Sequence, residues 1–375
     1  MMKVLLLEQI AKVAYKYTYS LANGLTHTGI DVDLVIDQKP EDENCTCKKY
    51  RYFNTDEKNI GKLQKVRNYI QTYKKIEQLI ATGEYDVLHS QWYIFSPVDF
   101  YFLSIFKKKY GIRYVATVHD ILPFNEKFYD MYFHKKLYGL ADSIILQAPG
   151  NVKRFVDLFP EDKEKIHMIP HGHMLDYVEI VNQNDARKHL DIPNDKTVFL
   201  FFGQIKRVKG VDILLKAFLK LLQKRDDIYL VIAGNVWKAD FSVCQEIIDR
   251  NDFKGCLRTD IHYIPDDEVK YYYSATDVCV LPYTDVYQSG VIQLAYGYQK
   301  PVVSSDLQAF TQFVKEGETG FISKACDVES LTGAMDKAAN SNQLVEIGKA
   351  DYELVKKTLN WDDLARKIVE DCYSE

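Results

Sequence analysis

The sequence lacks the cysteine patterns that hold structural zinc or build a disulfide framework. Its seven cysteines are scattered, no two of them form a C-x-x-C pair, and Cys45 and Cys47 have no histidine cluster beside them. Such cysteine usage is typical of chains that stay in a reducing compartment. We therefore expect a cytoplasmic protein.

A long hydrophobic run is also missing, and we expect no leader. The first ten residues, MMKVLLLEQI, form too short an apolar run to span a bilayer, and no small-residue cleavage site follows them. We interpret this run as the first buried strand.

Neither a strong charge excess nor an acidic metal motif is present. The formal net charge is −5 in 375 residues, so the overall charge gives no indication of a nucleic-acid partner. No D-x-D motif stands at the end of an expected strand, and we expect no bound metal.

Short apolar runs alternate with longer amphipathic segments through most of the chain. In the first half the expected strands cover residues 3–7, 31–36, 87–89, 114–118, 143–146 and 167–169, and residues 60–80 have apolar positions at helical spacing. A polar segment, 171–194, has the composition of a linker. After it the pattern restarts with a helix at 211–222 and strands at 198–202, 229–233, 261–263, 278–281 and 301–304. This alternation predicts an α/β protein with two doubly wound, Rossmann-like domains that face a cleft.

Doubly wound folds bind ligands at the carboxyl ends of their parallel strands. The loop at residues 202–210 (FGQIKRVKG) follows such a strand. Gly203 permits close approach of the backbone to a ligand. Three cations follow, Lys206, Arg207 and Lys209, where they would favour a bound diphosphate. The alternative is a solvated basic loop before an ordinary helix.

A second segment follows the expected strand 278–281 and leads into a helix near Gln288, Ser289 and Gly290. The first turn of a helix presents free backbone N–H groups and partial positive charge to an anion. The alternative is that Ser289 is an N-capping residue and Gly290 a small neighbour for packing.

Together these segments resemble glycosyltransferase family 4. Members of that family carry a G-R-x-x-x-x-K-G loop and an E-x7-E motif that ends near G-x-P-V-V. The matching segments are residues 203–210, Ala233-Gly234, Asp277-Val278-Cys279-Val280-Leu281-Pro282 and Pro301-Val302-Val303. In the first half the resemblance rests on His119-Asp120, Ala141-Asp142 and Ile169-Pro170-His171-Gly172.

The resemblance implies the GT-B fold, in which two Rossmann-like domains face a central cleft. Residues 1–175 would bind the acceptor, residues 190–355 would bind the nucleotide sugar, and a C-terminal helix within 356–375 would pack back on the first domain. The implied reaction moves a hexose from a UDP- or GDP-linked sugar to a saccharide or lipid-linked saccharide, in surface polysaccharide synthesis. The loop cations and helix N–H groups supply positive charge for the leaving diphosphate, so no metal or other cofactor is expected.

The chain departs from the family pattern at three positions. Gln204 stands where the family has the arginine of G-R, and Lys206 or Arg207 could replace that charge. Counting back from the P-V-V segment, the two family glutamates fall on Val286 and Leu294. The chain thus resembles a bacterial subgroup with S-Q-S-G-V in this loop and a degenerate E-x7-E motif. Asp285 and Gln288 flank the gap and could compensate.

His119 and Asp120 follow the expected strand 114–118. The resemblance implies that His119 contacts the donor sugar, while Asp120 would shape the loop or transfer a proton. The alternative is a half-buried histidine beside a capping aspartate. For His89 and His171, which also lie near strand ends, we expect a structural role.

An aromatic stretch at residues 92–106 runs into Lys107, Lys108 and Lys109. Such a stretch could bring the enzyme to a lipid-linked acceptor, peripheral at the inner membrane face. The alternative, a core helix with a solvated basic end, is the one we favour.

Two other functions remain open from the sequence. A sugar-nucleotide epimerase of the same architecture would need acidic residues in the cleft, and a non-catalytic protein with two hinged domains would only bind sugar. For a transferase, retention of anomeric configuration is the default that the resemblance implies. Inversion would need a base such as Asp120.

Overall fold

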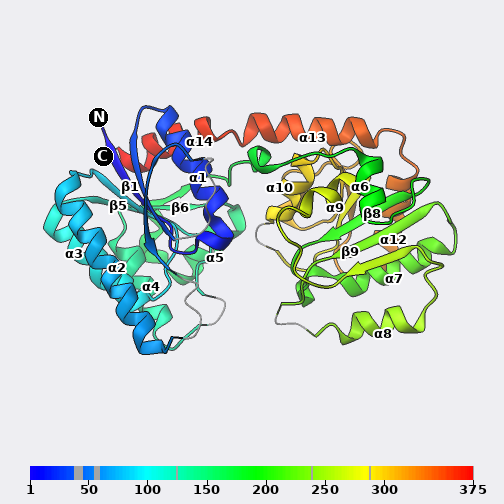
Figure 1. Ribbon diagram of the computed structural model, residues 1–375, viewed down its shortest axis with the longest axis horizontal. Coiled ribbons are helices and arrows are strands. Elements are labelled where there is room, and N and C mark those ends of the chain that lie inside the picture. The colour runs from blue at the N-terminus through cyan, green and yellow to red at the C-terminus, as the bar shows by residue number, and fades with distance from the viewer. Residues whose placement is uncertain (38–44, 55–59, 124–125, 238–239, 287–288, 375) are drawn as a thin grey trace. The chain divides into compact units, whose positions relative to one another are not determined.

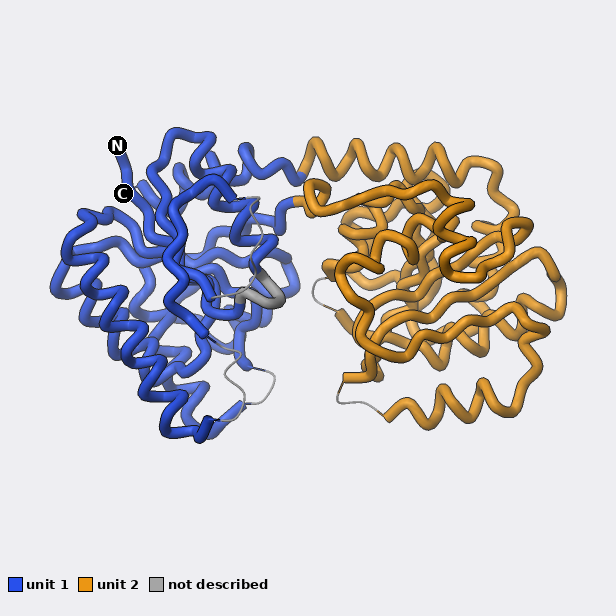
Figure 2. The backbone as a smooth tube through the Cα atoms, viewed as in Figure 1, with its two compact units in different colours: residues 1–172, 359–375 blue, residues 173–358 orange. Residues whose placement is uncertain are grey.

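The computed structural model describes residues 1–37, 45–54, 60–123, 126–237, 240–286 and 289–374. The chain forms two compact units, shown in Figure 2. Unit 1 comprises Met1–Gly172 and Leu359–Glu375, and unit 2 comprises His173–Thr358.

Unit 1 contains a seven-stranded parallel sheet in the order β3-β2-β1-β4-β5-β6-β7 (Figure 1). Its strands are β1 (Lys3–Leu7), β2 (Asp31–Asp37), β3 (Lys48–Phe53), β4 (Val87–Ser90), β5 (Arg113–Thr117), β6 (Ser143–Leu146) and β7 (Ile166–Met168). Its helices are α1 (Ala11–His27), α2 (Lys62–Gly83), α3 (Ser96–Tyr110), α4 (Asp130–Leu140), α5 (Pro149–Leu158) and α14 (Trp361–Ile368). The central strands are buried on both faces, which is why they read as continuous apolar runs.

Unit 2 contains a six-stranded parallel sheet in the order β10-β9-β8-β11-β12-β13. Its strands are β8 (Thr197–Phe202), β9 (Ile228–Ala233), β10 (Leu257–Asp260), β11 (Val278–Leu281), β12 (Val302–Ser305) and β13 (Phe321–Ser323). Its helices are α6 (Gln183–His189), α7 (Val211–Leu222), α8 (Ser242–Arg250), α9 (Val269–Ala275), α10 (Gly290–Gly297), α11 (Gln308–Thr311), α12 (Val328–Ala339) and α13 (Leu344–Thr358).

Each sheet has a switch point where the strand order reverses. In unit 1 it lies between β1 and β4, and in unit 2 it lies between β8 and β11. The loops that leave two such neighbouring strands diverge to opposite faces of the sheet and leave a crevice between them. Ligands of doubly wound folds bind in that crevice. The predicted α/β fold with two doubly wound domains is therefore confirmed.

Some strands were missed or misplaced by the sequence pattern. The expected strand at 261–263 is wrong, because the edge strand of this sheet is β10 and the Tyr263 side chain just beyond it is 67% exposed. β10 contains Arg258 and Asp260, whose side chains pair at 2.7 Å, so it does not read as an apolar run. β3 was missed for the same reason, since an edge strand needs apolar residues on fewer positions.

The C-terminal segment packs inside unit 1, on helix α1. A Cβ on Gly24 of α1 would come within 2.7 Å of the Trp361 carbonyl oxygen, so the two helix backbones approach closely. At the end of the segment, the Tyr373 hydroxyl and His89 Nδ1 are 2.7 Å apart, and Arg113 Nε donates to the Cys372 carbonyl at 2.7 Å.

Helix α6, which lies in the segment expected to be a linker, is held to the sheet of unit 2 by an ion pair. Arg187 of α6 reaches Asp277 beside β11, with Nη2 and Oδ2 2.6 Å apart, and its Nε donates to the Ala275 carbonyl at 2.9 Å. Asp277 Oδ2 also accepts the Val198 N–H at 2.7 Å, which links α6 to β8 as well.

We predict that Arg187→Ala destabilises unit 2 by roughly 3 kcal/mol, because it strands a carboxylate that is only 25% exposed. Lys188→Ala, at an exposed position of the same helix, serves as the matched control and should change stability by less than about 0.5 kcal/mol. Denaturant unfolding followed by circular dichroism measures both. Equal midpoints for the two variants would contradict a structural role for this pair.

Candidate active site

The crevice of unit 2 is shaped by close backbone contacts between strand ends. Gly203, just after β8, donates its N–H to the Ala233 carbonyl of β9 at 3.0 Å. Gly234 follows β9 with φ +144°, and a Cβ there would lie 1.9 Å from the Gly203 carbonyl oxygen. Only glycine fits at Gly234, so this A-G strand end has a packing cause.

The basic loop after β8 is held against the loop after β11. Gly210 has φ +66°, and a Cβ on it would come within 2.0 Å of the Pro282 carbonyl oxygen. The Thr284 N–H donates to the Val208 carbonyl at 2.9 Å. These backbone contacts place the two predicted phosphate-binding segments side by side at the switch point.

Lys209 is the most constrained cation of this loop. Its Nζ lies 3.5 Å from the centre of the buried Tyr283 ring. Burial, and then the charge of Lys206, lower the pKa of Lys209 to about 7. Lys206 is partly exposed and Arg207 is exposed. Lys209 is thus largely removed from water, whereas Lys206 and Arg207 are more hydrated. In the alternative, all three side chains would be solvated.

The start of helix α10 is open toward an additional group. Ser289 precedes the helix but makes no capping hydrogen bond, and its buried side chain lies beside the Tyr283 hydroxyl. A Cβ on Gly290 would meet no described atom within 4 Å. Neither the N-cap nor the packing alternative therefore explains these two residues. Gln288 lies outside the described residues.

At the position of the second family glutamate this chain has Leu294, and the residue before it is polar. Leu294 of α10 is partly buried, and the adjacent Gln293 is buried with an Oε1 that has no partner in the described part of the chain. Asp285 is exposed. Gln293 was missed by the sequence analysis, although a glutamine inside an apolar helix pattern was a usable signal.

In unit 1, His119 sits in an aromatic cluster at the carboxyl edge of the sheet. Its ring stacks on Trp92, with centroids 4.6 Å apart and planes 15° apart, and meets the edge of Tyr17 at 4.8 Å. Its Nε2 lies 3.1 Å from Gln91 Oε1, which makes Nε2 the protonated nitrogen. Burial, and then the nearby His171, lower the pKa of His119 to about 3, so the ring is neutral at physiological pH.

Several neighbours of His119 were missed by the sequence analysis. Gln91 and Trp92 follow β4, so the strand-end rule that found His119 would have found them too. Tyr17 comes from α1, and Gln147 follows β6 beside Tyr17 and His119. The position of Tyr17 depends on how α1 packs, which no local pattern predicts. Asp120 is exposed at the edge of this cluster.

The structural role expected for His89 agrees with its surroundings. The ring is fully buried, its Nε2 is 2.7 Å from the Thr117 hydroxyl, and burial lowers its pKa to about 3. His171 packs its edge on Tyr17 at 4.8 Å, and its Nδ1 donates to the Gly172 carbonyl at 2.6 Å.

The aromatic stretch at residues 92–106 belongs mainly to the core, as the favoured alternative predicted. Phe102 and Phe106 of α3 are buried, and Lys107 pairs with Asp142 at 2.6 Å. Tyr101, 58% exposed, is the exception.

The described residues lack two further kinds of feature. They contain no group of three His, Cys, Asp or Glu side chains placed to hold a metal ion. None of their helices combines the length and apolar character needed to cross a membrane.

We predict that Gly210→Ala lowers stability by about 1–2 kcal/mol from the left-handed backbone alone, and by more from the clash with Pro282. Gly333→Ala, at an open position inside helix α12, is the matched control and should raise stability by about 0.5–1 kcal/mol. Thermal unfolding measures both. A Gly210→Ala variant as stable as the native protein would contradict the described contact between the two loops.

Comparison with known proteins gives matches over both units. Residues 182–353 match the family Glycosyl transferases group 1, and residues 15–177 match Glycosyltransferase Family 4. The D-inositol 3-phosphate glycosyltransferase of Streptosporangium roseum is 21% identical over 70% of this chain and 63% of its own length. The lipopolysaccharide 1,2-N-acetylglucosaminetransferase of Salmonella typhimurium is 24% identical over 58% of this chain and 59% of its own length. The chain thus spans about three fifths of these two relatives.

Solved structures share the fold over almost the whole chain. HepE of Anabaena, in complex with UDP and glucose, superimposes with a TM-score of 0.71, 16% identity and 99% coverage of both chains. The catalytic domain of starch synthase IV from Arabidopsis thaliana, bound to ADP and acarbose, gives a TM-score of 0.76 at 12% identity, covering 100% of this chain and 98% of that one. The two family matches leave few residues between 15 and 353 uncovered. From these matches and the two switch-point sheets, we conclude that the chain is a glycosyltransferase of family 4 with the GT-B fold.

Proposed function

We propose that the enzyme moves a hexose from a UDP- or GDP-linked sugar to a saccharide or lipid-linked saccharide acceptor, in surface polysaccharide synthesis. One observation carries this proposal. Lys206 and Lys209 share the switch-point crevice of unit 2 with the open helix start at Ser289 and Gly290. A nucleotide diphosphate is the ligand class that needs both cations and free N–H groups.

The donor diphosphate would lie against the cations of the loop and the first turn of α10. As the sugar–phosphate bond breaks, negative charge grows on the leaving diphosphate, and preorganised cations and N–H groups stabilise it. Lys209 and Lys206 would carry most of this charge, with Arg207 at the exposed side. These groups perform the task without a metal ion, and Gln288 would join the same contact.

His119 would accept or donate a hydrogen bond at a hydroxyl of the donor sugar. Its neutral ring has Nε2–H engaged by Gln91, and a sugar O–H would bond to Nδ1 in competition with the neighbouring Gln147 side chain. We propose retention of anomeric configuration, with Asp120 shaping the loop. Because the family carboxylates are replaced by Val286 and Leu294, Gln293 would supply the polar contact near the donor.

The epimerase alternative would need an acidic residue free to move a proton. Glu8 follows β1 and is fully buried, and burial raises its pKa to about 7. Its two oxygens accept the Thr18 hydroxyl and the Ile10 N–H, which commits it to holding the first loop. No observation therefore favours the epimerase over the transferase. A cytoplasmic location with peripheral contact at the inner membrane face remains part of the proposal.

We predict that Lys209→Ala and Lys206→Ala each weaken UDP or GDP binding roughly ten- to a hundredfold, because each removes a charged hydrogen bond of about 1.5–3 kcal/mol. Lys216→Ala on α7 is the matched control, since this lysine pairs with Asp212 on the helix surface. Titration calorimetry with UDP and GDP measures all three. Native affinity for UDP and GDP in both loop variants would contradict binding of the diphosphate by this loop.

We predict that His119→Ala lowers turnover by at least tenfold while nucleotide affinity stays within about twofold, because the ring meets the sugar and not the nucleotide. The exposed His262→Ala variant is the control. Asp120→Asn should retain most of its activity, and NMR of the product should show a retained anomeric proton. An inverted product together with an inactive Asp120→Asn enzyme would instead make Asp120 the catalytic base.

A further inference from the structure

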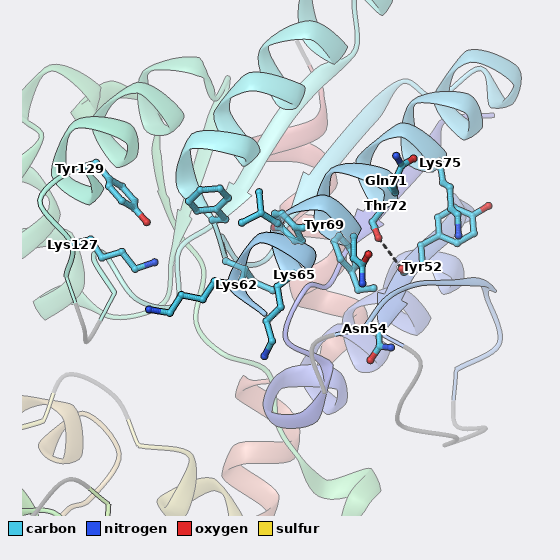
Figure 3. Close-up of a pocket in the computed structure, with 15 residues that line it drawn as sticks. Tyr52, Asn54, Lys62, Lys65, Tyr69, Gln71, Thr72, Lys75, Lys127 and Tyr129 are labelled. Carbon is cyan, nitrogen blue, oxygen red and sulfur yellow. Dashed lines mark hydrogen bonds between the residues drawn. The ribbon is translucent and has the colours of Figure 1, made fainter. Parts of the chain in front are cut away.

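A cavity of about 830 Å³ opens in unit 1, and its lining includes Ile94, two residues after the Trp92 that stacks on His119. Its wall is formed by the end of strand β3, one side of helix α2, and the short segments before helices α3 and α4. Figure 3 shows Lys62 of α2 and Lys127 of the segment before α4 extending into the same space. The volume suits a ligand of the size of a small oligosaccharide.

The cavity is lined by lysines that have no ion-pair partner among the described residues. Lys62, Lys65, Lys75 and Lys127 all line it, and none of them makes an ion pair with a described residue. No aspartate or glutamate is among the described lining residues. Elsewhere in unit 1 comparable lysines are paired, as Lys109 is with Glu77 at 2.9 Å. Lys62, Lys65 and Lys127 lie at one end of the cavity, whereas Lys75 lies at the other end beside Tyr52. The lysines at the first end repel one another, so this end favours an anion.

Helix α2 adds its positive end to this site. It begins at Lys62, its N-cap residue Gly61 has no side chain to accept a hydrogen bond, and its first turn contains no acidic residue. The first N–H groups of a 22-residue helix thus stand beside Lys62 and Lys65 without a side-chain cap. The charged residues of the described lining are lysines, and lysine binds phosphate as a point charge.

Aromatic rings form the rest of the wall and are held in place. Lys127 Nζ lies 5.9 Å from the ring centre of Phe95 and 5.4 Å from that of Tyr129. The buried Asp99 accepts the Phe95 N–H at 3.0 Å and the Tyr69 hydroxyl at 2.5 Å, which fixes this wall to α2. Rigid aromatic faces beside cations suit a ligand with an apolar ring face and a charged group.

We propose that this cavity is the acceptor site and that the acceptor is a phosphate-bearing saccharide. The phosphate would sit among Lys62, Lys65, Lys127 and the start of α2, and the sugar ring would pack on Phe95 and Tyr129. This inference rests on the transferase function proposed above and names the class of its acceptor. The same phosphate chemistry is found in a soluble sugar phosphate and in the diphosphate of a lipid-linked saccharide.

The test measures binding of two probes to the full chain. The soluble probe is glucose 1-phosphate, with free glucose as its uncharged counterpart. The lipid probe is a phosphatidylcholine vesicle that contains polyprenyl diphosphate, with a phosphatidylglycerol vesicle of equal charge as its counterpart. The variants are Lys62→Ala/Lys65→Ala and Lys127→Ala. Lys74→Ala, exposed on α2 and outside the cavity, is the matched control.

We expect the native chain to prefer one phosphate probe over its counterpart, and the cavity variants to lose at least tenfold in affinity for it while Lys74→Ala does not. Preference for glucose 1-phosphate would identify a soluble acceptor, and preference for the polyprenyl vesicle a lipid-linked one. Equal binding of each probe and its counterpart, or native affinity in the cavity variants, would overturn the proposal. The cavity variants should bind UDP as tightly as the native chain does. Failure of the native chain to bind UDP would contradict the donor site and not this cavity.

Discussion

The contact between two backbone loops at the switch point of unit 2 underlies the whole donor site. Because β8 and β11 are parallel neighbours, the loops that follow them leave the same edge of the sheet. Gly210 packs on the Pro282 carbonyl, and the Thr284 N–H bonds to Val208, so the loop conformations depend on backbone contacts. Lys209 is carried onto the Tyr283 ring as a consequence. The cation is therefore placed by the fold before any ligand arrives, which reduces the ordering cost of binding.

The candidate sites of the two units differ in their electrostatics. In unit 2 burial lowers the pKa of Lys209 to about 7, so this side chain is only partly protonated near neutral pH. A bound diphosphate would favour its protonated form. In unit 1 burial keeps His119 neutral, so it contributes hydrogen bonding without charge. Both effects have the same cause, desolvation of the charged form of the side chain. In the functions proposed here, positive charge would meet phosphate at the crevice in one unit and at the lysine-lined cavity in the other.

The sequence predicted what local patterns determine. The bounds of α7 and β11 were found to the residue, because a buried parallel strand is a short continuous apolar run and an amphipathic helix has apolar residues at helical spacing. The cations of the basic loop were found because they follow a strand directly. The edge strand β3 was missed because its sequence, KKYRYF, is charged, and the lysine-lined cavity that it borders was missed with it. The stacking of Trp92 on His119 was missed because it depends on the order of strands in the sheet, although each of the two residues follows a strand end. Contacts between distant segments set these features, and no local spacing encodes them.

Proton uptake on donor binding tests the central claim most directly. A nucleotide sugar carries a diphosphate whose charge does not change near neutral pH, so any proton exchanged belongs to the protein. With a pKa of about 7, Lys209 is mostly neutral at pH 8, and a bound diphosphate raises that pKa. Calorimetry with UDP-glucose or GDP-mannose at pH 8, in buffers of different ionisation enthalpy, should show uptake of most of one proton by the native enzyme and none by Lys209→Met, with native affinity falling as pH rises above 7. Binding without proton uptake, or equal uptake by the variant, would contradict the placement of the donor diphosphate on Lys209.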